Sequence, residues 1–128
     1  MNKIEVFELI AQEGDKKGFM ANGYTCLIMR MPLGHLCGYV LLTENDVNCG
    51  KDYDAIQLVD GVHGGLTFSE YCDGKYLPKG YWIGFDCAHC SDLIPKASYE
   101  LSNQVYRTME YVKLELQSLT KQLKEVSK

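Results

Sequence analysis

The chain has 128 residues, a net charge of −4, and shares of 46% hydrophobic and 23% charged residues. This length fits a single domain that can bury a core without disulfides or a metal, and the balance is typical of a soluble globular protein. The longest apolar runs, such as residues 39–42, are far too short to span a membrane. The negative charge argues against binding to duplex nucleic acid, which requires clustered Lys and Arg.

The first residues lack the basic and then apolar layout of a signal peptide, so we expect a cytoplasmic protein. This placement decides how the six cysteines are interpreted. In a reducing compartment they are expected to be free thiols or metal ligands rather than disulfide partners.

The first element that we expect is a short amphipathic helix over residues 3–13. Apolar residues recur there at helical spacing, at Ile4, Phe7, Ile10 and Ala11. Gly14 then supplies a stop. The polar stretch 14–23 that follows is punctuated by glycine and is predicted to be a loop.

Strand character dominates the middle of the chain. The runs 24–31 and 36–43 are rich in β-forming residues and are joined by a short Pro/Gly segment, which indicates a hairpin. Further strands are predicted at 56–62, 66–71 and 80–87. The last two are separated by a turn that contains glycine, so they should pair antiparallel.

The clearest element is a helix over residues 98–128. Pro95 precedes it, Ser98 can cap it, and Glu100 places a negative charge in the first turn. Its apolar residues alternate at spacings of three and four, as in a coiled-coil seam. A helix of about 30 residues would be roughly 45 Å long, more than the diameter of a small domain.

We therefore expect residues 1–97 to form a core domain and residues 98–128 to pack on that core and on a partner helix. The simplest partner is a second copy of the chain, which makes a homodimer. The oligomerisation seam would consist of Val112, Leu116, Leu119 and Leu123. For residues 101–112, packing on the chain's own sheet is the open alternative. The predicted fold class is α+β, with a short N-terminal helix, an antiparallel sheet of about four or five strands, and a long C-terminal helix.

Side chains that could carry chemistry gather in two runs, 62–68 and 81–92. If the strands that contain them pair antiparallel, the start of the first lies beside the end of the second. We therefore expect one ligand-binding pocket at this end of the sheet. Its predicted residues are His63, Gly64, Gly65, Thr67, Trp82, Asp86, His89 and Asp92.

Plainer explanations exist for each member of this set. Asp86 and Asp92 can cap turns by accepting backbone N–H groups, the glycine pair can form a bulge, and Trp82 can be part of the core. If the cluster is instead catalytic, His63, Asp86 and His89 would supply the acid–base groups.

Zinc is the alternative to a site without a cofactor. Cys87 and Cys90 form one C-x-x-C pair, and His63 and His89 could complete a tetrahedral set. No second C-x-x-C pair follows, so we expect no cofactor. Both cysteines can also serve as small apolar groups at a turn.

The runs VHGGLT at 62–67 and WIGFDCAH at 82–89, followed by Asp92, resemble a family of small proteins encoded by bacterial viruses and prophages. The hairpin end 34–40 and the tail with Tyr111 and Glu115 fit the same pattern, so the resemblance covers roughly residues 34–123. HGGLT and GFDCAH are its specific motifs. Cys90 stands where the family has other small or variable residues, which argues against a zinc site.

The resemblance supplies no activity, but it implies a phage accessory protein that acts in the cytosol of the host bacterium. We expect a binding protein, in a counter-defence role, that sequesters a small nucleotide-like signal or grips a host protein through the pocket. The alternative function is a small metal-dependent hydrolase that uses the His/Asp/Cys cluster.

Overall fold

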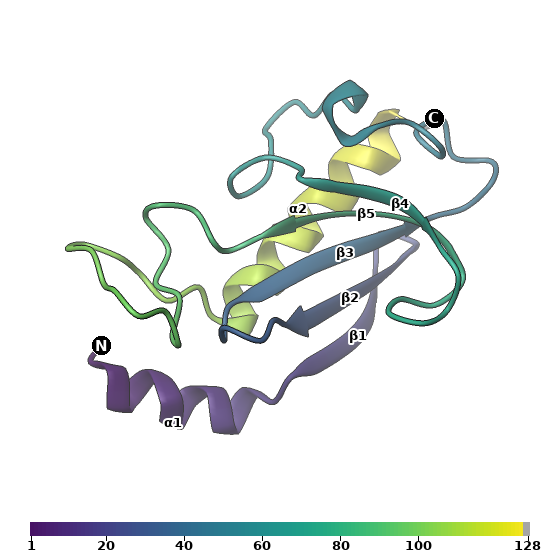
Figure 1. Cartoon of the computed structure of the whole chain (residues 1–128). Coiled ribbons are helices and arrows are strands. Elements are labelled where there is room, and N and C mark those ends of the chain that lie inside the picture. The colour runs from purple at the N-terminus through teal and green to yellow at the C-terminus, as the bar shows by residue number, and fades with distance from the viewer. Residues whose placement is uncertain (127–128) are drawn as a thin grey trace.

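The computed structural model describes residues 1–126, which form one antiparallel sheet of five strands and two α-helices (Figure 1). The strands lie in the order β1-β2-β3-β5-β4. This arrangement confirms the predicted α+β class. The elements are α1 (Lys3–Glu13), β1 (Lys16–Ala21), β2 (Tyr24–Arg30), β3 (Leu36–Leu42), a short 3-10 helix η1 (Tyr53–Ala55), β4 (Phe68–Cys72), β5 (Gly80–Asp86) and α2 (Met109–Val126).

Helix α1 has the predicted bounds, and its ends explain them. The Asn2 side chain accepts the Glu5 N–H at 2.8 Å, and the Glu5 carboxylate accepts the Asn2 N–H at 3.0 Å, which forms a capping box. Gly14, with φ +79°, ends the helix. The face that packs on the rest of the protein centres on Val6, whereas Ile4 is exposed.

Strand β1 occupies residues that we expected to form a loop. It pairs antiparallel with β2 across a two-residue turn at Asn22 and Gly23. Both residues have positive φ, +51° and +85°, as a type I′ hairpin turn requires. The prediction of a loop is therefore wrong, and β1 is an edge strand of the sheet.

The described chain forms no strand at 56–62, contrary to expectation. Side chains of α2 bond its backbone instead. Gln122 accepts the Asp60 N–H at 2.9 Å and donates to the Gly61 carbonyl at 2.9 Å. Because these bonds satisfy groups that a strand would pair with a neighbour, the segment stays a loop fixed on the helix.

Helix α2 begins at Met109, not near residue 98. The Thr108 hydroxyl accepts the Tyr111 N–H at 3.0 Å and caps the helix. Before it, Asn103 has φ +66°, and Val105 accepts the Leu93 N–H at 2.9 Å, so the chain here is not helical. The helix has 18 residues and is thus about 27 Å long.

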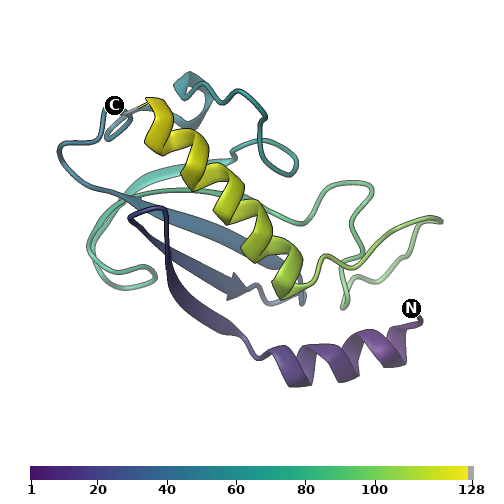
Figure 2. The same cartoon turned by 180° about the vertical axis from the view of Figure 1, so that it is seen from behind.

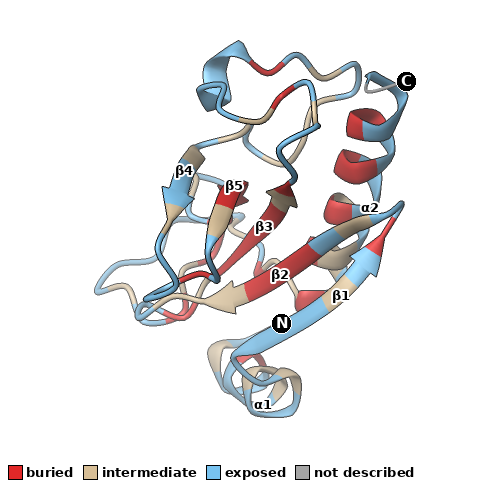
Figure 3. Ribbon diagram, turned by 90° about the vertical axis from the view of Figure 1, so that its right-hand side faces the viewer, coloured by how far each residue is buried: buried red, intermediate tan, exposed pale blue. Residues whose placement is uncertain are grey.

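The apolar stripe of α2 packs on one face of the chain's own sheet (Figures 2 and 3). Its four seam residues, Val112, Leu116, Leu119 and Leu123, have no exposed surface. The seam that we expected to face a partner helix is therefore the attachment of the helix to the sheet. A homodimer stays a prediction, without these residues as its surface.

The opposite face of the sheet has a separate core. Trp82 is buried there with Leu27, Tyr39 and Leu77, and its indole N–H donates to the Pro78 carbonyl at 2.8 Å. The turn between β4 and β5 supplies Leu77 and thus covers this face. Among the described residues, no helix is both long and apolar enough to cross a membrane.

Candidate functional site

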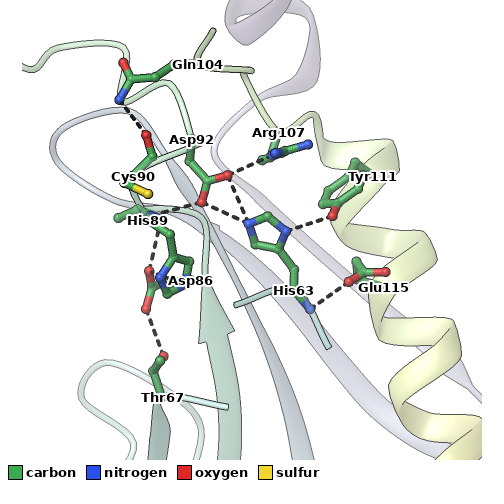
Figure 4. Close-up of polar contacts among 11 residues, drawn as sticks. His63, Thr67, Asp86, His89, Cys90, Asp92, Gln104, Arg107, Tyr111 and Glu115 are labelled. Carbon is green, nitrogen blue, oxygen red and sulfur yellow. Dashed lines mark hydrogen bonds and ion pairs between the residues drawn. The ribbon is translucent and has the colours of Figure 1, made fainter. Parts of the chain in front are cut away.

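His63 and Asp92 are in direct contact at the end of the sheet where the pocket was predicted (Figure 4). The His63 Nε2 atom lies 2.9 and 3.0 Å from the two Asp92 carboxylate oxygens. Asp92 also accepts the Arg107 Nε–H at 2.8 Å and the backbone N–H of His89 at 3.0 Å. The Asp92 side chain is 0% exposed, so it is a buried charge held by three donors.

The carboxylate fixes the tautomer of His63. An ionised carboxylate can only accept, so Nε2 of neutral His63 carries the hydrogen and Nδ1 is the acceptor. The Tyr111 hydroxyl lies 2.8 Å from Nδ1 and, with neutral His63, donates to it. Asp92, His63 and Tyr111 therefore form one hydrogen-bonded chain that links a turn, a loop and α2.

The surroundings set the charges of these groups. Burial opposes the charged form of Asp92, but hydrogen bonds from His63 and Arg107 outweigh it and lower the pKa of the carboxyl group. The hydrogen bond to Asp92 raises the pKa of Arg107. Burial, with the nearby charge of Glu115, raises the pKa of the Tyr111 phenol. At neutral pH the site thus contains a carboxylate, a guanidinium and a protonated phenol.

An outer layer surrounds this inner chain. The rings of His89 and His63 lie 5.7 Å apart, centre to centre. Asp86 accepts the Thr67 hydroxyl at 2.8 Å, and its other carboxylate oxygen lies 3.5 Å from His89 Nε2. That Nε2 atom is buried and has no hydrogen-bond partner among the described residues. Unlike those of His63 and Asp92, the His89 and Asp86 side chains are about one-third exposed, at 33% and 29%.

Most of the predicted ligand-binding residues therefore meet. Asp86 and Asp92 also cap turns, as the plainer explanation held, because they accept the N–H groups of Ala88 and His89. Trp82 is the exception, since it is buried on the opposite face of the sheet. The residues that converge are His63, Gly64, Thr67, Asp86, His89 and Asp92, with Gly65 next in the chain.

Four further residues escaped the prediction. Tyr111 and Glu115 are four apart on α2, which places them on one side of the helix, and Arg107 lies just before its first residue. Glu115 accepts the His63 N–H at 2.7 Å. His35 lies just before β3, whose start pairs with the end of β5. Burial lowers the pKa of its imidazole, although the negative charge of Asp86 acts in the opposite direction.

The proposed zinc ligands do not form a metal site. Within residues 1–126, no three or more His, Cys, Asp or Glu side chains are placed to hold a metal ion. Cys87 is buried in the core beneath α2, where burial raises the pKa of its thiol, whereas Cys90 is exposed. All six cysteines are free thiols.

Gly64 is needed for the close contact with His89. A Cβ atom added at Gly64 would lie 2.1 Å from His89 Nε2, whereas one added at Gly65 would meet nothing within 4 Å. Both glycines have positive φ, +66° and +81°, so alanine at either position carries left-handed strain of about 1–2 kcal/mol.

We expect Gly64→Ala to lose about 1–3 kcal/mol more than Gly65→Ala, because it also overpacks the His89 ring. Urea unfolding of the two variants measures the difference. Equal losses would mean that His89 does not pack on Gly64.

The fold and the site define a small α+β protein whose sheet end carries a hydrogen-bonded Asp-His-Tyr chain with a buried carboxylate and an arginine bound to it. Comparison of this protein with family models, with curated proteins and with solved structures gives no match.

Proposed function

We propose that the chain is a binding protein that holds a small, phosphate-bearing, nucleotide-like ligand beside Arg107. The observation that carries this proposal is the state of the Arg107 guanidinium. Its Nε–H is bound by Asp92, while its two terminal amines have no hydrogen-bond partner among the described residues. A fixed guanidinium with two free amines matches the geometry of a phosphate.

The nearby carboxylates do not offer free acceptors in the same way. Asp86, Asp92 and Glu115 each accept hydrogen bonds from groups of the protein. The terminal amines of Arg107, in contrast, keep their donors free, which suits an anionic ligand. Arg107 is also oriented by its contact with the Tyr111 ring, 5.2 Å from its centre.

The exposure of the side chains separates two roles. Arg107 and His89 are 21% and 33% exposed and can touch a ligand. His63 is 10% exposed and lies beneath them, where it shares Asp92 with both. The partly exposed His89 ring offers a flat face on which a base can stack. Phosphate and base of one small molecule would thus contact neighbouring side chains.

The resemblance to phage and prophage proteins supports the biological role. We propose that the protein acts in the cytosol of a host bacterium and sequesters a nucleotide signal of a defence system. A polar cluster with free donors favours a small ligand over a host protein. No observation favours the metal-dependent hydrolase, because the described residues do not assemble its metal ligands.

Thermal unfolding in the presence of linear and cyclic nucleotides tests this proposal. A nucleotide at about 100 times its Kd adds about 2.7 kcal/mol, which raises Tm by on the order of 10 °C for a domain of this size. In Arg107→Gln the affinity should fall tenfold or more, because a hydrogen bond to a charged group contributes about 1.5–3 kcal/mol.

The control is Lys75→Gln, which removes the same charge at an exposed position in the turn between β4 and β5. Each shift is measured from the Tm of the same variant without ligand. A shift that Arg107→Gln retains in full, or the absence of any shift with the wild-type protein, would contradict the proposal.

A further inference from the structure

Tyr111 lies at the end of a hydrogen-bonded chain that resembles the arrangement of an activated nucleophile. In such sites a buried carboxylate orients an imidazole, and the free nitrogen of the imidazole accepts a hydroxyl proton. Here Asp92 binds His63 Nε2 at 2.9 Å, and His63 Nδ1 accepts from the Tyr111 hydroxyl at 2.8 Å. The order of groups and both distances fit proton transfer from the phenol to the imidazole.

Arg107 is a further neighbour of Tyr111. Arg107 contacts the Tyr111 ring, 5.2 Å from its centre, and donates from Nε to Asp92 at 2.8 Å (Figure 4). The terminal amines of Arg107, which have no hydrogen-bond partner among the described residues, can hold an anionic group at the site and stabilise the charge that develops on it during attack. Tyr111 is partly exposed, so the residue lies at the surface of the site.

We infer that Tyr111 is a nucleophile toward a phosphodiester, with His63 as its base and Asp92 as the residue that positions His63. The choice of a phosphodiester rests on the proposed function, whereas the activation of Tyr111 does not. This reaction of Tyr111 adds a covalent step to the proposed binding of the ligand.

The step balances without any other reactant. The Tyr111 oxygen forms a bond to phosphorus while the phenol proton moves to His63 Nδ1. The bond from phosphorus to the leaving oxygen breaks, and that oxygen takes the proton back from Nδ1. The products are an alcohol and a phosphodiester that joins Tyr111 to the rest of the ligand. Because burial raises the pKa of the phenol, Tyr111 is protonated at rest and needs this base.

A tyrosine-reactive electrophile tests the activation without knowledge of the ligand. Benzenesulfonyl fluoride forms a sulfonate ester with an activated phenol and releases fluoride, and peptide mass spectrometry then gives the labelling rate of each of the nine tyrosines. Tyr71 and Tyr99, which are 69% and 64% exposed, are internal references. We expect Tyr111 to react at least ~10-fold faster than either, because general-base catalysis contributes about 10²–10⁴-fold.

A purely structural hydroxyl would give the opposite order, since Tyr111 is less exposed and its proton is engaged. Labelling of Tyr111 at or below the rate of the references overturns the inference. In His63→Gln the advantage of Tyr111 should disappear while Tyr71 reacts as before. If Tyr111 keeps its advantage in this variant, His63 is not the base and the inference is wrong.

The two proposals can fail separately. Fast labelling of Tyr111 in a protein whose Tm no nucleotide raises would keep the nucleophile and refute the nucleotide ligand. A nucleotide-dependent shift in a protein whose Tyr111 labels slowly would keep the ligand and refute the nucleophile.

Discussion

Replacing Leu119 and Leu123 together by glutamate will unfold the protein instead of converting a dimer into a monomer. Both leucines are fully buried between α2 and the sheet. Loss of one buried Leu side chain costs about 2–5 kcal/mol, and a typical domain has only about 5–15 kcal/mol of stability. Two buried carboxylates add a further desolvation cost. Circular dichroism should therefore show loss of the folded signal at 25 °C.

The matched control is Leu114→Glu, because Leu114 lies on the same helix and is 53% exposed. We expect this variant to stay folded, with a change within about 0.5 kcal/mol. If the double variant is instead a folded monomer by light scattering, and the wild-type protein a dimer, the seam faces a partner and the packing of α2 described above is wrong.

The second large effect is expected at Asp92. Substitution by alanine leaves Arg107 and His63 without the carboxylate that both contact, and removal of one partner from a buried ion pair costs about 3–5 kcal/mol. Urea unfolding at pH 7 measures this loss. Asp52→Ala, at an exposed position with no side-chain cap bond, should change stability by less than about 0.5 kcal/mol.

The stability that Asp92 contributes should decrease at low pH. Its folded pKa is lower than the ordinary value, so its contribution is present above the unfolded pKa, about 3.9, and is lost as pH falls through the folded pKa. The difference in unfolding free energy between wild type and Asp92→Asn should therefore be constant near neutrality and shrink below about pH 4. A difference that grows on acidification would contradict the ion pair.

Most of the fold could be predicted from sequence patterns, and the errors in the prediction have local causes. The spacing of apolar residues gave α1, and β-forming runs joined by turn residues gave the β2–β3 hairpin and the antiparallel β4–β5 pair. Strand β1 was missed because two lysines and a glycine open it and most of its residues are exposed, although the Asn22-Gly23 turn that precedes β2 is a strong hairpin signal. The start of α2 was misplaced because Ser98 resembles a cap, whereas Val105 pairs with residues 91 and 93.

The site was predictable only in part, for a similar reason. Antiparallel pairing of two strands sufficed to place His63 beside Asp92. Arg107 and Tyr111 come from a segment that was treated as a seam, so their polar side was not considered. Trp82 was assigned to the pocket by its position in the run, but neighbouring strand residues alternate between faces, and its neighbours Tyr81 and Ile83 occupy the face beneath α2.

The central claim is that Asp92 orients His63 so that its Nδ1 atom accepts the Tyr111 hydroxyl. The most direct test is a ¹⁵N–¹H correlation spectrum of the histidine side chains at about pH 8, where an ordinary imidazole is neutral. We predict that His63 carries its hydrogen on Nε2 and that Nδ1 has the shift of a hydrogen-bonded acceptor, with the acceptor signal altered in Tyr111→Phe. A His63 that carries its hydrogen on Nδ1, or that interchanges freely between tautomers, would contradict the account.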